Sequence, residues 1–441
     1  MIESANHAAA RALQSFLSSL ADLPAASDEA DAVNRIALLE SIKAGCAAAQ
    51  VVETMRLEEL RLQAQTQAGV PTARRGRGLA AEVALARRAS GSTGGRHLGF
   101  ARALMREMPY TRAALAAGVL TEWRATILVR ETAHLTRTDR EEIDRRLCAD
   151  VSSLDGLGDR ALDAEAKRLA YELDPQAVVD RHTLATSDRR VSTRPAPDGM
   201  VRLSALLPLT AGISVYATLK RHADATVGAD ERTHSQVMAD ALVERVTGVS
   251  SVDQIPVAVN LVVSDEVLLG SGSAAAQVAG HGPIPAAIGR AIVQTAVDAN
   301  ARTTLRRIYT APASGALVAM DSAARLFPAG LAQFLDTRDQ GCRIPYCDNP
   351  IGEHDHAQPH ADGGKTTAAN GLGMCRSHNR AKQNPGWYVA TRDGTRTARH
   401  TATVTTPTGH THVSHAPPPP GHHDPEDSAV ERRVREWLNA A

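Results

Sequence analysis

The sequence predicts a mainly α protein: a large helical N-terminal domain with a small β component, followed by a small ββα module stabilised by metal. Three observations support this fold class. Apolar residues recur at helical spacing through most of the first 175 positions. The segments that read as strands are short, and the first of them begins at residue 200. Three of the five cysteines cluster between residues 342 and 375.

The bulk properties of the chain limit what it can do. A length of 441 residues allows two or three domains. The 49 Lys and Arg residues balance 49 Asp and Glu residues, so binding to nucleic acid must depend on local patches. The N-terminus has no basic start followed by an apolar run, and no uncharged apolar stretch approaches the roughly 20 residues of a membrane span. We therefore expect a soluble cytoplasmic protein with no membrane partner and with reduced cysteines.

The first part of the chain is predicted to form successive helices. Ile36, Leu39, Ile42 and Cys46 fall at helical spacing with charged residues between them. Short connections follow, and Thr121 and Thr138 are candidate N-caps. The predicted helices span residues 33–67, 79–90, 94–108, 111–117, 121–134, 138–151 and 160–173.

The middle of the chain is predicted to be mixed. The Pro-Asp-Gly turn at 197–199 leads into a strand at 200–203, and further strands are expected at 257–263 and 317–320. Helices are expected over residues 210–227 and 233–247. The predicted division is a helical domain (1–310), a connector (311–337), a metal module (338–392) and a tail (393–441).

The tail from residue 393 is rich in Pro, His and Thr and contains four consecutive prolines at 417–420. This composition is typical of disordered and polyproline segments, so we expect a largely disordered tail with a short charged helix at 426–440. Its histidines, including His400, lack repeated ligand spacing. They are expected to be solvated polar residues.

The cysteine cluster has the spacing of a metal site. Cys342 and Cys347 form C-x4-C, and Cys375 with His378 forms C-x2-H. Four such ligands are typical of tetrahedral structural zinc. The segment has few large apolar residues, so a metal ion would supply stability that a small core cannot. The alternative is that the three cysteines are ordinary buried thiols.

Further polar residues lie between and after these ligand pairs. Asp355 and His356 precede the Gly-Gly turn at 363–364, and Asn370 follows it. Asn379 comes directly after the last metal ligand, in a short helix that Pro385 ends. The segment therefore reads as strand, Gly-rich turn, strand and helix.

The order D-H, GG, N and C-x-x-H-N-x-x-K is similar to that of the HNH, or ββα-metal, nucleases. A more specific resemblance rests on three motifs: R-D-x-x-C-R-x-P-x-C at 338–347, D-H-x-x-P-H-A-D-G-G at 355–364 and A-A-N-G at 368–371. They resemble actinobacterial HNH signature proteins, which carry a long helical N-terminal domain of unknown function and include the mycobacterial 13E12 repeat family. The resemblance extends over most of the chain and is most specific in the C-terminal module.

The resemblance implies a metal-dependent endonuclease that hydrolyses phosphodiester bonds of nucleic acid, with DNA as the expected partner. His356 would be the general base, since an imidazole pKa near 6.5 suits that role. Asp355 and Asn379 would bind the catalytic ion, Mg²⁺ or another divalent cation, beside the structural Zn²⁺. Asn370 would brace the loop that holds His356. Three basic residues of the helix would contact phosphates: Arg376, Arg380 and Lys382.

Two further considerations stay open at the level of sequence. Neighbouring residues of a strand face opposite ways, so Asp355 and His356 converge only if the strand ends or bulges there. The alternative function is a catalytically silent zinc module that binds nucleic acid on a helical scaffold for partner docking or homo-oligomerisation. The presence of Asp355, His356, Asn370 and Asn379 together favours the enzyme.

Overall fold

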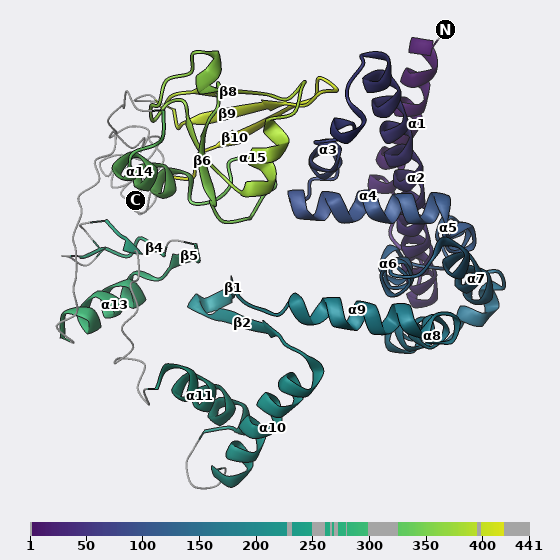
Figure 1. The fold of residues 1–441 in the computed structure, drawn as a ribbon, viewed down its shortest axis with the longest axis horizontal. Coiled ribbons are helices and arrows are strands. Elements are labelled where there is room, and N and C mark those ends of the chain that lie inside the picture. The colour runs from purple at the N-terminus through teal and green to yellow at the C-terminus, as the bar shows by residue number, and fades with distance from the viewer. Residues whose placement is uncertain are drawn as a thin grey trace. The chain divides into compact units, whose positions relative to one another are not determined.

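The computed structural model describes residues 2–226, 232–248, 261–264, 267–268, 272–278, 280–298, 325–394 and 398–418. The protein is mainly helical with small sheets, as the sequence predicts (Figure 1). It divides into two compact units, residues 1–57 with 99–178 and residues 58–98 with 179–441. Residues 58–98 therefore group with the C-terminal part of the chain, whereas the predicted division places them in the helical domain of residues 1–310.

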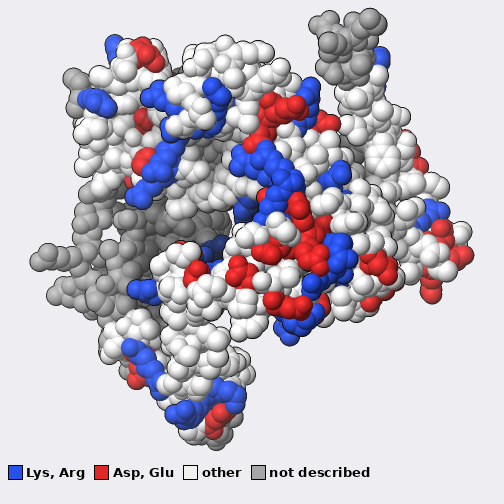
Figure 2. Space-filling view, turned by 45° about the vertical axis from the view of Figure 1, so that its right-hand side comes forward, with Lys and Arg blue, Asp and Glu red and all other residues white. Residues whose placement is uncertain are grey.

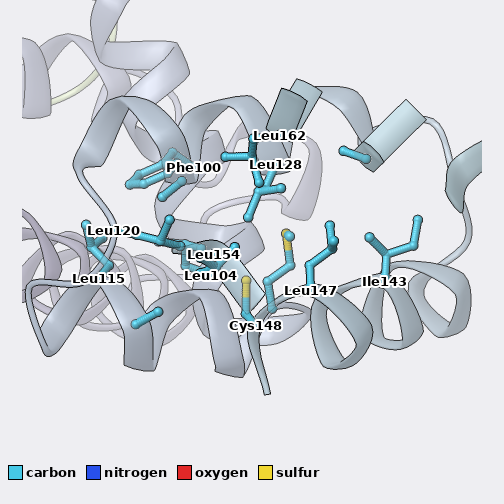
Figure 3. Packing of buried hydrophobic residues seen from close by; sticks show 14 of the residues in the cluster. Phe100, Leu104, Leu115, Leu120, Leu128, Ile143, Leu147, Cys148, Leu154 and Leu162 are labelled. Carbon is cyan, nitrogen blue, oxygen red and sulfur yellow. The ribbon is translucent and has the colours of Figure 1, made fainter. Parts of the chain in front are cut away.

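The first unit is a set of helices around one apolar core. Leu104, Leu115, Leu128, Ile143 and Leu162 are among its most buried side chains (Figure 3). The following helices lie wholly or partly within this unit: α1 (Ile2–Ala21), α2 (Glu29–Gln67), α4 (Gly91–Arg106), α5 (Pro109–Ala116), α6 (Glu122–Glu131), α7 (Arg137–Cys148), α8 (Asp159–Leu173) and α9 (Pro175–Ser187), with the 3-10 turn η2 (Val151–Leu154).

Local signals explain where these helices begin. Thr121 caps α6, because its hydroxyl accepts a hydrogen bond from the backbone N–H of Arg124. Thr136, and not the expected Thr138, caps α7 in the same way. Pro175 begins α9, because a proline at the first helical position loses no hydrogen bond. Helix α1 was not predicted from the sequence.

The second unit contains several small elements between residues 58 and 298. Strands β1 and β2 form an antiparallel hairpin, with the expected Pro-Asp-Gly segment at its turn. Of the strand predicted at 257–263, residues 261–263 are described and 261–262 form a strand, and the segments at 317–320 and 426–440 lie outside the described residues. The elements are η1 (Thr72–Arg74), α3 (Leu79–Ala86), β1 (Arg190–Pro195), η3 (Pro197–Gly199), β2 (Val201–Leu206), α10 (Leu209–Thr226), α11 (His234–Thr247), β3 (Leu261–Val262), β4 (Ala276–Val278), β5 (Gly282–Ile284) and α13 (Ala286–Asp298).

The C-terminal part of the second unit is a ββα module joined to a three-stranded sheet. Strands β6 and β7 pair antiparallel, with Glu353 opposite Met374 and His356 opposite Gly371. Helix α15 follows them, and the sheet then runs β8, β9, β10 with all pairs antiparallel. The elements are α14 (Ala329–Asp339), β6 (Glu353–His356), η5 (His360–Asp362), β7 (Gly371–Met374), α15 (Arg376–Lys382), β8 (Tyr388–Arg392), β9 (Thr401–Thr405) and β10 (Thr411–His415).

The expectation of a largely disordered tail does not hold for its described residues. Strands β9 and β10 lie within it, and the alternation of Thr with Ala and Val in β9 suits a strand with one buried face. Ala402 and Val404 of β9 are fully buried in the core of the module. Buried and partly exposed residues therefore alternate along β9, a pattern that the Pro-, His- and Thr-rich composition of the tail did not reveal.

Helix α3 belongs to the core of this module although it lies more than 250 residues earlier in the sequence. Leu85 packs in the same buried cluster as Leu372 and Met374. The buried carboxylate of Glu82 accepts hydrogen bonds from the backbone N–H and the hydroxyl of Thr408, at 3.1 and 2.6 Å. The segment around α3 is therefore part of the structure that positions the C-terminal residues.

Among the described residues, no helix combines the length and apolar character that crossing a membrane requires.

Candidate functional site

Four ligand atoms of the module converge as the sequence predicts. Atoms from Cys342, Cys347, Cys375 and His378 all lie within 4.8 Å of one another, and all four residues are buried. The sulfurs of Cys347 and Cys375 are 3.8 Å apart, and Nδ1 of His378 is 3.5 Å from the sulfurs of Cys342 and Cys375. Tetrahedral zinc with bonds of about 2.3 Å to sulfur implies S···S separations of roughly 3.8 Å. The group can therefore hold one metal ion, and its geometry and donor types fit zinc.

Local structure sets these ligands in place. Cys375 is the N-cap of α15, and its sulfur accepts a hydrogen bond from the backbone N–H of His378. His378 is the third residue of that helix, so the C-x2-H spacing directs both ligands to one point. Hydrogen bonds from the thiols of Cys342 and Cys347 lower the pKa of the Cys375 thiol, which favours the thiolate that binds a metal ion.

The far side of the His378 ring is closed by Gly91, the first residue of α4. A Cβ atom added to Gly91 would lie 2.6 Å from Nε2 of His378, a distance that no real Cβ contact shows. Nε2 itself is buried and has no hydrogen-bond partner in the described part of the chain. Only glycine fits at this position, so the start of α4 is shaped to the metal ligand.

A buried polar network joins α14 to β7. Arg338 donates to the carbonyl of Gly371 at 2.7 Å, and Asp339 accepts from the N–H of Gly373 at 2.8 Å. The two side chains also form an ion pair at 2.7 Å. Arg343 donates to the carbonyl of Ser414 at 2.9 Å, and burial lowers its pKa to about 10. The R-D-x-x-C-R motif therefore ties the strand before Cys375 to the C-terminal sheet.

His400 corrects the expectation that the tail histidines are solvated. Its side chain is 3% exposed, and Nε2 donates to the carbonyl of Ala369 at 2.9 Å. Burial lowers the pKa of His400 to about 4, so the imidazole is neutral at neutral pH. It anchors the β9 end of the sheet to the residue that precedes Asn370.

Asp355 faces α15 from strand β6. Its Oδ2 atom accepts hydrogen bonds from Lys382 at 2.7 Å and from Gln383 at 3.0 Å. Lys382 is buried and also donates to the carbonyl of His356. The prediction that Lys382 contacts phosphate is therefore wrong, because its ammonium group is already held inside the module. Arg376 and Arg380 are exposed on the same helix, where a polyanion can reach them.

His356 is the last residue of β6, and its side chain is 6% exposed. Nδ1 lies 3.9 Å from Oδ1 of Asp355, and Nε2 lies 2.8 Å from Oγ1 of Thr366. The β6–β7 pairing continues through His356 without a bulge. The end of the strand is therefore what allows the neighbouring side chains of Asp355 and His356 to approach each other.

The bond to Thr366 fixes the tautomer of His356. The Thr366 hydroxyl donates its one hydrogen to the carbonyl of Arg325, at 3.3 Å, so it accepts from an Nε2–H group. Nδ1 then carries the lone pair. Burial lowers the pKa of His356 from 6.5, with the carboxylate of Asp355 opposing this change. A neutral imidazole with a free Nδ1 can accept a proton near neutral pH.

Asn379 projects from α15 toward β6. Its amide nitrogen donates to Oε2 of Glu353 at 2.7 Å, while its Oδ1 atom is buried and has no hydrogen-bond partner among the described residues. Glu353 and Asp355 are two residues apart on β6 and share a face of it. Asn379 and Asp355 therefore belong to the same β6–α15 contact. A buried amide oxygen without a partner is costly, and a bound cation would satisfy it.

Asn370 braces the loop that follows His356. Its Oδ1 accepts from the N–H of Gln358 at 2.9 Å, and its Nδ2 donates to the carbonyls of Gln358 and Lys365 at 3.1 and 2.9 Å. Gly364 lies in this loop at a point where a Cβ atom would be 1.9 Å from the carbonyl of Gln358. These contacts agree with the role that the resemblance implies for Asn370.

Three residues of the site carry no prediction from the sequence. Thr366 orients His356, and Glu353 orients Asn379. Gln383 donates a hydrogen bond to the same Asp355 oxygen that Lys382 binds. Glu353 could have been recognised, because it lies two residues before Asp355 and so shares its face of the strand. Thr366 and Gln383 depend on the path of the loop and the turn of the helix, which the sequence does not specify.

Comparison with known proteins gives one match. A family described as a domain of unknown function (DUF222) matches residues 36–339. The matched segment ends at Asp339, so it includes α14 and its two buried charged residues. No curated protein and no solved structure matches the chain.

Proposed function

Because the chain belongs to the DUF222 family, whose description assigns no activity, we propose a function from the site itself: a metal-dependent HNH-type endonuclease that hydrolyses DNA phosphodiester bonds. One observation carries this proposal. Nδ1 of His356 lies 3.9 Å from Oδ1 of Asp355, and Asn379 of α15 binds Glu353 on the face of β6 that also carries Asp355, with its amide oxygen left without a partner among the described residues. Hydrolysis of a phosphodiester needs a proton acceptor and oxygen ligands for a divalent ion.

Each of these residues has a part in the proposed reaction. Nδ1 of His356 takes a proton from the attacking water, and the hydrogen bond to Thr366 keeps that nitrogen free. Lys382 and Gln383 hold Oδ2 of Asp355, so Oδ1 is the oxygen available as a ligand. A divalent ion held by Asp355 and Asn379 would stabilise negative charge on the scissile phosphate and the leaving oxygen.

We further propose that the four-residue cluster holds Zn²⁺ with a structural role. It uses three sulfurs and one ring nitrogen, which leaves no position for water in a four-coordinate site. Two of its ligands, Cys375 and His378, sit at the start of α15, and this helix carries Asn379. The zinc would therefore fix the helix against β6 and keep the catalytic residues in place.

Cleavage of supercoiled plasmid with and without added Mg²⁺ or Mn²⁺ tests the proposal. Wild-type protein should cut only with the added ion, and His356→Ala should lower the rate by roughly 10²–10⁴ because the general base is lost. His354→Ala is a matched control: His354 lies on the same strand but is bound to Asp336 at 2.7 Å, and its loss should not affect cleavage. Cleavage by His356→Ala at the wild-type rate would contradict the mechanism.

The ion pair between the buried Lys382 and the half-buried Asp355 favours one alternative. An ammonium group at 2.7 Å already neutralises the carboxylate, which weakens it as a ligand for a cation. The module could then be a zinc-stabilised nucleic-acid-binding domain without catalytic activity. That reading predicts no metal-dependent cleavage by the wild type, and the same DNA affinity in wild-type, His356→Ala and Asn379→Ala proteins.

A further inference from the structure

We propose that the β1–β2 hairpin is a DNA-binding ribbon that supplies a contact outside the ββα module. Figure 1 shows the hairpin between α9 and α10. Every residue of both strands is exposed. This inference deepens the proposed function, on which it rests for the choice of a polyanionic partner. It names duplex DNA as the form of substrate that the chain binds.

The register of the hairpin separates its side chains into two different faces. Residues that pair directly lie on the same side of the ribbon, and the side alternates along each strand. One face is mostly apolar and carries no charge: Val191, Thr193, Pro195, Val201, Leu203 and Ala205. The other carries three arginines, two serines and one leucine: Arg190, Ser192, Arg194, Arg202, Ser204 and Leu206.

The basic face contains an uncompensated pair of like charges. Arg194 pairs directly with Arg202 across the two strands, and no acidic residue shares their face. Like charges directly opposite each other destabilise a hairpin. Neither guanidinium has an ion-pair partner in the described part of the chain. A bound polyanion would remove this repulsion.

Several arginines of helices α7 and α8 are placed differently. Arg145 and Arg146 of α7 both bind Glu142, and Arg168 of α8 binds Glu165 and Glu172. Figure 2 shows blue and red side chains interleaved over much of the drawn face. A merely solvated charged surface has this mixed character. The hairpin departs from it, because its arginines share one face with serines and no acid.

The shape of the element identifies the partner as double-stranded DNA. The major groove of B-form DNA is wide enough for a two-stranded β-ribbon, whereas the major groove of an RNA duplex is deep and narrow. Arginine can bind a phosphate or a guanine edge with two parallel hydrogen bonds, and serine can contact either. The hairpin presents both residue types on one face that a groove can enclose.

The experiment measures binding separately from cleavage. Full-length His356→Ala protein is titrated against a fluorescent 20-base-pair DNA duplex without added divalent ion, and the anisotropy gives the affinity at several salt concentrations. We compare this protein with one that also carries Arg194→Ala and Arg202→Ala. The charge-matched control carries Arg11→Ala and Arg160→Ala, two exposed arginines on α1 and α8.

Loss of the hairpin arginines should lower the affinity at least tenfold and reduce the salt slope by about 0.9 for each phosphate contact removed. The control pair should change the affinity less than twofold. Arg202→Glu should abolish the hairpin contact and raise the melting temperature, because it replaces a cross-strand repulsion by an attraction. An RNA duplex of the same sequence should bind at least tenfold more weakly than DNA.

Equal affinity of the hairpin double variant and the control, or equal binding of RNA and DNA duplexes, would overturn the inference. Failure of the proposed function gives a different result. If wild-type protein never cleaves but the hairpin variants lose DNA affinity, the ribbon is a binding element of a protein without nuclease activity. If the wild type cleaves and the hairpin variants bind DNA normally, the proposed nuclease function is supported and DNA binding by the hairpin is refuted.

Discussion

Nε2 of His356 lies 2.8 Å from Oγ1 of Thr366, and the Thr366 hydroxyl in turn donates to the carbonyl of Arg325. This chain of two bonds keeps the His356 proton on Nε2 and leaves Nδ1 able to accept another. Thr366, which lies between strands β6 and β7, therefore determines which nitrogen of His356 can act as the proposed base. It is a positioning role, since Thr366 need not touch the substrate.

Thr366→Val should test this role, because valine keeps the shape of threonine but removes the oxygen. We expect the cleavage rate to fall 10–100-fold, a size typical for partners that orient a functional residue, while zinc content stays the same. Thr366→Ser should restore most of the rate, since it keeps the hydroxyl. A steady-state analysis of plasmid nicking for all three proteins gives the comparison. Full activity of Thr366→Val would show that the tautomer of His356 is not limiting.

The pH dependence of cleavage should report the same imidazole. Burial lowers the pKa of His356 below 6.5, so the base is deprotonated at neutral pH and the rate should fall only below about pH 6.5. The ring of His360 lies 5.7 Å away and contributes to this lowering. His360→Ala should therefore move the acidic limb to higher pH. A limb that stays in place, or moves to lower pH, would assign it to another group.

Glu353 should control the affinity for the catalytic ion. Its carboxylate accepts from the amide nitrogen of Asn379 and so turns the amide oxygen toward the site. Glu353→Gln can donate as well as accept, which lets the Asn379 amide flip. We expect the Mn²⁺ concentration for half-maximal cleavage to rise 10–100-fold, with the rate at saturating ion largely recovered. If the metal dependence of cleavage is unchanged in Glu353→Gln, Glu353 does not influence binding of the catalytic ion.

The fit between Gly91 and His378 predicts an asymmetry between two glycines of one helix. Gly91→Ala would force a Cβ atom to within 2.6 Å of the ligand ring, so it should release zinc and lower the melting temperature. Gly95→Ala meets no atom within 4 Å and should stabilise α4 by about 0.5–1 kcal/mol. Zinc content by elemental analysis and thermal melts distinguish the two. Cys375→Ser provides the reference for complete loss of the metal.

The sequence predicted the helices best where apolar periodicity and capping residues agree, as at α6, and it predicted the metal cluster because its spacing is diagnostic. It missed strands β9 and β10, because short Thr- and His-rich strands look like disordered sequence until a buried face is known. It also assigned Lys382 to the surface. A charge is exposed by default, and only the return of α15 onto β6 buries this one.

The burial of His400 makes a prediction about stability rather than activity. The imidazole binds the carbonyl of Ala369 as a neutral donor, and burial holds its pKa at about 4 in the folded protein, against about 6.5 in the unfolded chain. Between these values the unfolded chain binds more protons, so stability must rise with pH across this window. The contribution is complete above pH 6.5 and is lost progressively as the pH falls toward 4. The largest loss is roughly 3 kcal/mol.

A matched pair of variants isolates this effect from the other groups that titrate at acidic pH, the zinc-binding thiolates included. His400→Gln keeps a donor for Ala369 but cannot gain a proton in this range, so its melting temperature should fall less than that of wild type between pH 7 and pH 5. His415→Gln changes an exposed histidine of the same sheet and should keep the wild-type dependence. Parallel curves for His400→Gln and wild type would mean that His400 is protonated in the folded protein without cost, which the contact with Ala369 and the complete burial of the ring argue against.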